Sequence, residues 1–110
     1  MAALALSMEH KRGDTMVIMG TYKDSNGVPI SLVGYQIKSQ IRDADGALLE
    51  TLTCSIIDPL VGRYQAIATH DQTSLWTMGT YRFDIQFTAP DGTVSSSKTI
   101  KLKVIEDQTL

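Results

Sequence analysis

Cysteine is nearly absent from this sequence, and that scarcity limits the fold. Cys54 is the only cysteine among 110 residues. No disulfide can form within the chain, so the sequence lacks the pattern of a small secreted scaffold held together by cross-links. A lone cysteine is more often a small core residue than a reactive thiol, and we expect Cys54 to pack in the interior.

Basic charge is not in excess. The chain has 10 Lys and Arg residues against 12 Asp and Glu residues, and its formal net charge is −2. A surface that binds nucleic acid through bulk electrostatics needs a basic excess. We therefore expect no nucleic-acid partner.

Long apolar runs and targeting signals are also missing. No stretch approaches the roughly 20 apolar residues that cross a bilayer. The apolar opening, residues 1–6, lacks the basic region and the length of a signal peptide. We expect no membrane association, and we interpret residues 1–10 as a first strand or an arm, residues 11–107 as a single β-sandwich domain and residues 108–110 as a tail.

Residues that carry catalysis or bind metals are few and scattered. His10 and His70 are the only histidines, and neither a Gly-x-Ser-x-Gly motif nor a Gly-rich phosphate loop is present. A zinc site needs three or four closely spaced ligands, which the sequence does not contain. Asp43 and Asp45 flank a turn, and carboxylates that bond their own turn backbone explain them without a calcium ion. We therefore expect no catalytic residues, metal, cofactor or small-molecule substrate, and we interpret the protein as not an enzyme.

Alternation of apolar and polar residues dominates the segment 79–88. Tyr81, Phe83, Ile85 and Phe87 alternate with polar residues, and this period of two places them on one face of a strand. A Gly-x-Tyr-x-Phe run that follows a helical turn resembles the start of strand F in immunoglobulin-like sandwiches. There the tyrosine hydroxyl bonds back to upstream backbone. Antibody domains carry a cysteine two residues after that tyrosine, and here the apolar Phe83 takes its place.

Turn signals divide the rest of the chain into runs of strand length. Asn-Gly and Asp-Gly dipeptides recur at short intervals, which is typical of a sandwich or barrel. We expect an all-β fold, an immunoglobulin-like β-sandwich of about seven antiparallel strands with one short helical turn. The helical turn is expected near residues 71–76, with Asp71 or Thr73 capping its first amides. The expected strands are residues 3–10, 15–23, 35–43, 48–57, 62–69, 79–88 and 94–105.

The last hairpin can be given a register. A two-residue loop at Asp91-Gly92 pairs residues whose numbers sum to 183, which sets Phe83 opposite Ile100. The same register turns Lys98 inward opposite Ile85, and we attribute this conflict to fraying at the open end.

The Asp-Gly hairpin in the middle of the chain allows two registers. One directs Leu52 and Cys54 to the core, and a shift by one residue directs Leu49 there instead. We prefer the first, which also sets Cys54 opposite Ile37 and Ile56 opposite Tyr35, although it places Glu50 opposite Ile41.

The expected core collects the inward-facing residues of these strands. It comprises Val17 or Ile18, Tyr35, Ile37, Ile41, Leu52, Ile56, Tyr64, Trp76, Tyr81, Phe83, Ile85, Phe87, Ile100, Leu102 and Val104.

Two stretches are candidate interaction sites. In the first, Leu4, Leu6 and Met8 alternate with small residues; this run either completes a sheet of its own domain or adds a strand to a neighbouring subunit. In the second, Lys101 and Lys103 share the outward face of the final strand. They either dock an anionic partner or keep an edge strand from pairing with other chains.

Arg12-Gly13-Asp14 spells a known adhesion tripeptide. Three residues match by chance often, and the tripeptide acts only at an exposed loop tip. We interpret it as a tight turn between the first two strands, in which Gly13 supplies a backbone conformation that other residues resist.

The order of several short motifs resembles a family of small bacteriophage proteins. Arg-Gly-Asp-Thr at residues 12–15 precedes an apolar strand, and Asp-x-x-Gly-x-Pro-x-x-Leu-x-Gly follows at 24–34. An Ile-Arg-Asp-x-x-Gly turn at 41–46, a Trp-x-x-Gly strand at 76–86 and a Gly-to-Ile ending at 92–100 complete the pattern. The resemblance covers nearly the whole chain from residue 11 onward, and residues 1–10 fall outside it.

This resemblance implies an immunoglobulin-like sandwich that sits in the virion after assembly in the host cytoplasm and has no enzymatic activity. The implied partners are other virion proteins (major capsid, tail or baseplate proteins) and copies of the chain itself. No family active site carries over to this sequence. Capsid decoration or stapling and a tail, neck or baseplate position are both compatible with the residues.

Two functions follow as hypotheses. The first is a non-enzymatic virion structural protein that docks on a symmetric particle lattice, where many copies make weak single contacts adequate. The alternative is a host-surface or carbohydrate-binding β-sandwich module, which would need an exposed aromatic side chain such as Trp76.

Overall fold

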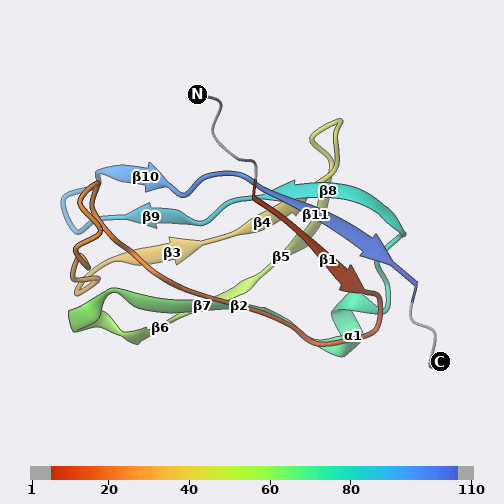
Figure 1. The fold of residues 1–110 in the computed structure, drawn as a ribbon, viewed down its shortest axis with the longest axis horizontal. Coiled ribbons are helices and arrows are strands. Elements are labelled where there is room, and N and C mark those ends of the chain that lie inside the picture. The colour runs from red at the N-terminus through yellow and green to blue at the C-terminus, as the bar shows by residue number, and fades with distance from the viewer. Residues whose placement is uncertain (1–5, 107–110) are drawn as a thin grey trace.

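The computed structural model describes residues 6–106 as two layers of β-structure with one short α-helix (Figure 1). The elements are β1 (Leu6–Lys11), β2 (Met16–Thr21), β3 (Gln36–Lys38), β4 (Gln40–Arg42), β5 (Leu48–Thr51), β6 (Thr53–Asp58), the 3-10 helix η1 (Pro59–Val61), β7 (Arg63–Ala68), α1 (His70–Thr73), β8 (Gly79–Phe83), β9 (Gln86–Thr88), β10 (Val94–Ser96) and β11 (Ile100–Ile105).

The first layer contains two sheets that share the same ribbons. One sheet has the order β1-β11-β8-β4-β5 and the other has the order β10-β9-β3. Figure 1 shows β10, β9 and β3 continuing into β11, β8 and β4, so that three ribbons run through both sheets. The second layer is the sheet β2-β7-β6. The expected all-β sandwich with one short helical turn is confirmed.

The strand β1 is the exception to the antiparallel pattern. It pairs in parallel with β11, from Leu6 opposite Ile100 to Lys11 opposite Ile105. Residues 6–11 therefore complete a sheet of their own domain, next to the C-terminal strand.

Four of the expected strands are each divided in two, and their break points are bonded to one another. The Ser39 hydroxyl donates to the Asp84 carbonyl at 2.6 Å, and the Leu52 amide donates to the Ser39 carbonyl at 2.9 Å. A second pair of bonds joins the break between β8 and β9 to the break between β10 and β11. The Ile85 amide donates to Ser97 Oγ at 2.9 Å, and the Ser97 amide donates to the Ile85 carbonyl at 2.8 Å. We call these five residues, Ser39, Leu52, Asp84, Ile85 and Ser97, the break line.

The break line redirects one ribbon to the other layer. Before Leu52, β5 pairs with β4 in the first layer; after it, β6 pairs with β7 in the second. Sandwich corners are commonly made by strands that bend and switch sheets in this way. Ser39 is only 2% exposed at this bend, so its hydroxyl needs the acceptor that Asp84 supplies.

The last hairpin contains two features that the sequence register missed. Its loop has three residues, Pro90-Asp91-Gly92, closed by Ala89 and Thr93, and Gly92 has a φ of 91°. A type I turn followed by a left-handed residue is a common form of such loops. The expected two-residue loop is therefore wrong.

An extra residue further along the hairpin cancels that error. Ser96 pairs with Gln86, and Ile100 pairs with Phe83. Between these two pairs, residues 97–99 on one strand lie opposite residues 84–85 on the other. This bulge restores the expected Phe83–Ile100 pair, which is confirmed. Lys98 lies exposed in the bulge rather than inward, so the explanation by fraying is wrong.

The middle hairpin follows the preferred register only as far as Leu52, which is buried. Beyond Leu52 the expected pairs Cys54–Ile37 and Ile56–Tyr35 are wrong, because β6 pairs with β7 in the second layer and sets Cys54 opposite Ala66 and Ile56 opposite Tyr64. Glu50 does lie opposite Ile41. Its carboxylate accepts hydrogen bonds from Trp76 Nε1 and from Gln72 Nε2, both at 3.2 Å. These two donors explain why an acidic side chain occupies an inward position.

The helix α1 begins with a capping box. The side chain of Thr69 accepts a hydrogen bond from the Gln72 amide, and the Gln72 side chain accepts one from the Thr69 amide. The expected caps Asp71 and Thr73 are therefore wrong. Capping falls to the residue just outside the helix, and Thr73 is buried instead.

The core lies between the two layers and matches most of the expected set. The buried apolar residues are Met16, Leu32, Ile41, Leu52, Tyr64, Ala66, Ala68, Trp76, Tyr81, Phe83, Ile85, Phe87, Leu102 and Val104. Of the two alternatives on β2, Ile18 packs against this core and Val17 is 49% exposed. The sequence did not single out Met16, Leu32, Ala66 and Ala68.

The tyrosine expected at the start of strand F takes its expected role. The Tyr81 hydroxyl donates to the Thr77 carbonyl at 2.6 Å, four residues upstream. This bond ties the turn after α1 to the first residues of β8.

Replacing Tyr81 by Phe removes this bond and keeps the ring. We expect Tyr81→Phe to lower the free energy of unfolding by about 0.5–1.5 kcal/mol, measured by urea titration. Tyr35→Phe is the matched control, because the Tyr35 ring also packs against the core and its hydroxyl has no bonded partner within residues 6–106. Equal effects of the two substitutions would show that the hydrogen bond from Tyr81 to the Thr77 carbonyl does not stabilise the fold.

Ser39→Ala tests the break line. It leaves the Asp84 carbonyl without its buried donor, and we expect a loss of about 1–3 kcal/mol in the free energy of unfolding. The control is Ser55→Ala on the exposed face of β6, which should change stability little. A Ser39→Ala protein as stable as the Ser55→Ala protein would show that the bond does not hold the bend.

Candidate interaction surfaces

The two histidines lie apart and have separate structural partners. His10 donates from Nε2 to the Asp14 carbonyl at 2.8 Å and packs against Trp76 with ring centres 6.1 Å apart. His70 is exposed, 3.3 Å from the Asp71 carboxylate. Within residues 6–106, no group of three or more His, Cys, Asp or Glu side chains converges as a metal site would require.

Trp76 is enclosed rather than displayed. It is 2% exposed, and its indole N–H donates to Glu50. A sugar ring stacks on an exposed aromatic face, which Trp76 does not present. The residue that the carbohydrate-binding alternative depends on is therefore part of the core.

Cys54 behaves as a small core residue, as expected. It packs against the buried cluster, and its thiol lies 3.8 Å from the Leu52 carbonyl. Burial raises the pKa of the Cys54 thiol, partly offset by a hydrogen bond with the Ser39 backbone. The raised pKa disfavours the thiolate, which is the reactive form.

The Arg12-Gly13-Asp14 segment is a tight turn held against α1. Gly13 has a φ of 96°, and the Asp14 amide donates to the Lys11 carbonyl at 3.2 Å. The buried Thr73 hydroxyl accepts from the Gly13 amide at 3.0 Å and donates to the Asp14 carbonyl at 2.7 Å. The turn interpretation is confirmed, since the backbone is fixed to the helix rather than presented at a loop tip.

The three candidate residues near the N-terminus have different places. Met8 is partly buried and packs against the core from β1. Leu6 is the first residue of β1, where its backbone pairs with Ile100. Leu4 lies outside the described residues.

Lys101 and Lys103 lie on the outer face of β11, and both are exposed. The strand β11 has β1 on one side and β8 on the other, so it is not an edge strand. The edge-protection interpretation is therefore wrong. With Ser7, Met8, Glu9 and Thr80, the two lysines line a shallow hollow of about 510 Å³.

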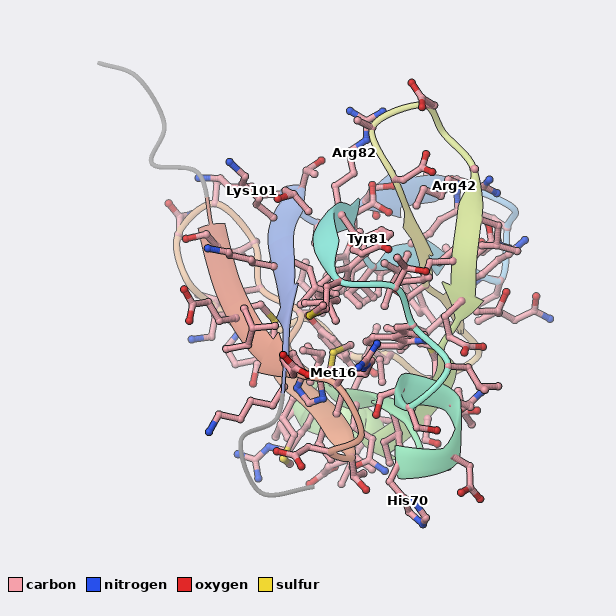
Figure 2. The ribbon with its side chains drawn as sticks, turned by 90° about the vertical axis from the view of Figure 1, so that its right-hand side faces the viewer. Met16, Arg42, His70, Tyr81, Arg82 and Lys101 are labelled. Atoms are coloured by element: carbon pink, nitrogen blue, oxygen red, sulfur yellow. The ribbon has the colours of Figure 1, made fainter. Side chains whose placement is uncertain are left out.

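Two further cations share this face and were missed from the sequence. Arg82 on β8 pairs with Lys101, and Arg42 on β4 pairs with Arg82. Figure 2 shows Lys101, Arg82 and Arg42 along the same upper side of the molecule, with Tyr81 nearer the interior. The register expected for the last hairpin already places Arg82 opposite Lys101, so this pair could have been predicted from the sequence. The neighbour Arg42 could not, because it depends on the pairing of β4 with β8.

The outer face of the sheet β2-β7-β6 has the opposite character. Val17 is 49% exposed and Met19 is 62% exposed. Val17 pairs with Ile67, and Met19 pairs with Gln65, so no charged residue interrupts these two pairs. Exposed apolar side chains that lie together on a sheet commonly mark a protein–protein contact. We call Val17, Met19 and Ile67 the apolar face.

Comparison with known proteins identifies the fold. No family model matches the chain, and a search of curated proteins found no match. Among solved structures, the N-terminal domain of phage TP901-1 ORF48 matches with a TM-score of 0.58 and 18% sequence identity, covering 94% of this chain and 85% of that one.

Two other solved structures share the architecture. The natural killer cell receptor NKp44 matches with a TM-score of 0.52 and 18% identity, covering 94% of this chain and 100% of that one. CopC from Methylosinus trichosporium OB3b matches with a TM-score of 0.50 and 10% identity, covering 96% of this chain and 89% of that one. These likenesses show a shared β-sandwich, a fold that hosts unrelated functions. As for membranes, no helix within residues 6–106 has the length and apolar character to span a bilayer.

The environment of Cys54 predicts a slow thiol. At about pH 8, we expect iodoacetamide to alkylate the native protein about tenfold or more slowly than the urea-denatured protein, because burial and a raised pKa both suppress the thiolate. Mass spectrometry of timed samples measures both rates. Equal rates in the two states would contradict the core position.

Proposed function

We propose that the protein is a non-enzymatic structural component of a bacteriophage particle that docks on a symmetric array of other virion proteins. The observation that carries this proposal is the likeness to a phage domain over 94% of the chain. The order of the motifs between residues 12 and 100 supports the same assignment, since it resembles small phage proteins.

The side chains favour a binding role over catalysis. The two histidines serve a turn backbone and an exposed carboxylate, and the single thiol packs in the core. An enzyme needs an acid, a base or a nucleophile converging on one site. The described residues instead leave two outer sheet faces open, one apolar and one cationic.

The apolar face is suited to the docking contact. Val17, Met19 and Ile67 occupy neighbouring strands of a sheet whose other side packs on the core. A contact of this kind buries modest area, and repetition of the same contact over a lattice compensates through avidity. Capsid decoration and a tail, neck or baseplate position both satisfy this description.

The proposal predicts that the chain is a constituent of the particle. Mass spectrometry of purified virions from the phage that encodes it should detect many copies per particle, and cryo-electron microscopy should place them at symmetry-related positions. Consistent absence from infectious particles would contradict the proposal.

A binding assay tests the apolar face directly. Particles that lack the chain should retain the added protein on sedimentation, and Met19→Asp should reduce retention about tenfold or more by placing a charge in an apolar contact. Val94→Asp is the matched control, because Val94 on β10 is 54% exposed and lies on another sheet. If both variants bind equally well, the apolar face is not the contact.

A further inference from the structure

Three cations form a row across the outer face of the five-stranded sheet. Lys101 on β11 pairs with Arg82 on β8, and Arg82 pairs with Arg42 on β4. Neighbouring strands lie about 4.8 Å apart, so the three Cα atoms fall within about 10 Å of one another across the strands. Lys103 lies two residues beyond Lys101 on the same face. We call Arg42, Arg82, Lys101 and Lys103 the cationic face.

No acidic residue neutralises this row within the described chain. The one ion pair found among residues 6–106 joins His70 and Asp71, far from this sheet face. Two carboxylates border the row: Glu9 lies opposite Lys103, and Asp84 lines a small hollow with Arg42 and Arg82. Neither carboxylate reaches ion-pair distance of a cation.

Arg42 is held in position by neutral acceptors. Its guanidinium donates to the Gly46 carbonyl at 2.9 Å and to Gln40 Oε1 at 2.8 Å. These bonds fix the side chain along the sheet and leave its charge uncompensated. A guanidinium that is already ordered loses less side-chain entropy when it binds a carboxylate.

The row opposes the stability of the fold. Like charges directly opposite one another on paired strands are destabilising. The packing of these strands comes from the inward neighbours Ile41, Phe83 and Leu102, which are all buried. Neutral polar residues would serve an outer sheet face at lower electrostatic cost, so the cations point to a role outside the isolated chain.

We propose that the cationic face binds a carboxylate-rich segment of a partner protein. Arg42 and Arg82 can each bind a carboxylate through two parallel hydrogen bonds. Alternate side chains of an extended segment are about 6.6 Å apart, which is also the spacing of Lys101 and Lys103 along β11.

This surface is separate from the apolar face. It lies on the first layer of the sandwich, and the apolar face lies on the second, so one copy can contact two partners. The inference rests on the proposed function only in placing the acidic partner inside a phage particle. An acidic polymer tests the surface without any particle.

The experiment measures binding of fluorescently labelled poly-glutamate to the full chain by anisotropy at low ionic strength. We expect saturable binding that weakens as salt rises, and we expect Arg42→Gln/Arg82→Gln/Lys101→Gln to lower the affinity about tenfold or more. The control Lys23→Gln/Lys38→Gln/Arg63→Gln removes the same charge from exposed positions outside this sheet and should change affinity less than about threefold.

A stability measurement separates a binding role from a structural one. If the row serves binding, Arg82→Gln relieves repulsion and should raise the melting temperature by about 1–4 °C at low salt. A structural role would lower it.

Besides a lowered melting temperature of Arg82→Gln, three results would overturn the inference. They are failure of the wild-type chain to bind poly-glutamate, equal loss of affinity in the two triple variants, and tighter binding to DNA of matched charge than to poly-glutamate. Absence of the chain from phage particles would contradict the proposed function and leave the outcome of these binding measurements unchanged.

Discussion

The hydrogen bonds of the break line hold the bend in the first layer of the sandwich, and the arrangement of the sheets follows from that bend. Ser39 supplies its hydroxyl to the Asp84 carbonyl and its own carbonyl to the Leu52 amide, while Ile85 and Ser97 bond to each other. Strand pairing must stop where the ribbons bend, and an unpaired buried backbone group costs free energy. The line supplies partners at that point, so the layer can bend and β6 can leave it to pair with β7.

The bend also determines what the outside of the molecule displays. Beyond the break line, β4, β8 and β11 form a separate sheet with β1 on one side and β5 on the other. Because Ile41, Phe83 and Leu102 face the core there, the residues beside them, Arg42, Arg82 and Lys101, face solvent together. On the second layer, the same alternation leaves Val17 and Met19 exposed. A passive sandwich thus acquires two chemically different faces, which suits a protein that connects others.

Local patterns in the sequence correctly predicted those features that depend on neighbouring residues along the chain. Alternation in the segment 79–88 identified the buried face of β8 and β9, and the Gly-x-Tyr-x-Phe run identified the Tyr81 corner. The break line was not predicted, because a bulge is stabilised by partners remote in sequence; its one local sign was Lys98 on an inward position. The two register errors in the last hairpin cancelled, so a correct Phe83–Ile100 pair came from a wrong loop. Only part of the cationic face was predicted from the sequence. Lys101 and Lys103 share one strand, whereas Arg42 joins them only because β4 pairs with β8.

Amide hydrogen exchange followed by NMR tests the break line most directly. We expect slow exchange at Ile85 and Ser97, because the amide of each donates to the other residue across the bend, and fast exchange at Lys98, whose amide has no partner within residues 6–106. A protected Lys98 amide together with a rapidly exchanging Ser97 amide would mean that the two strands pair without a bulge. That result would contradict the bend and the sheet arrangement built on it.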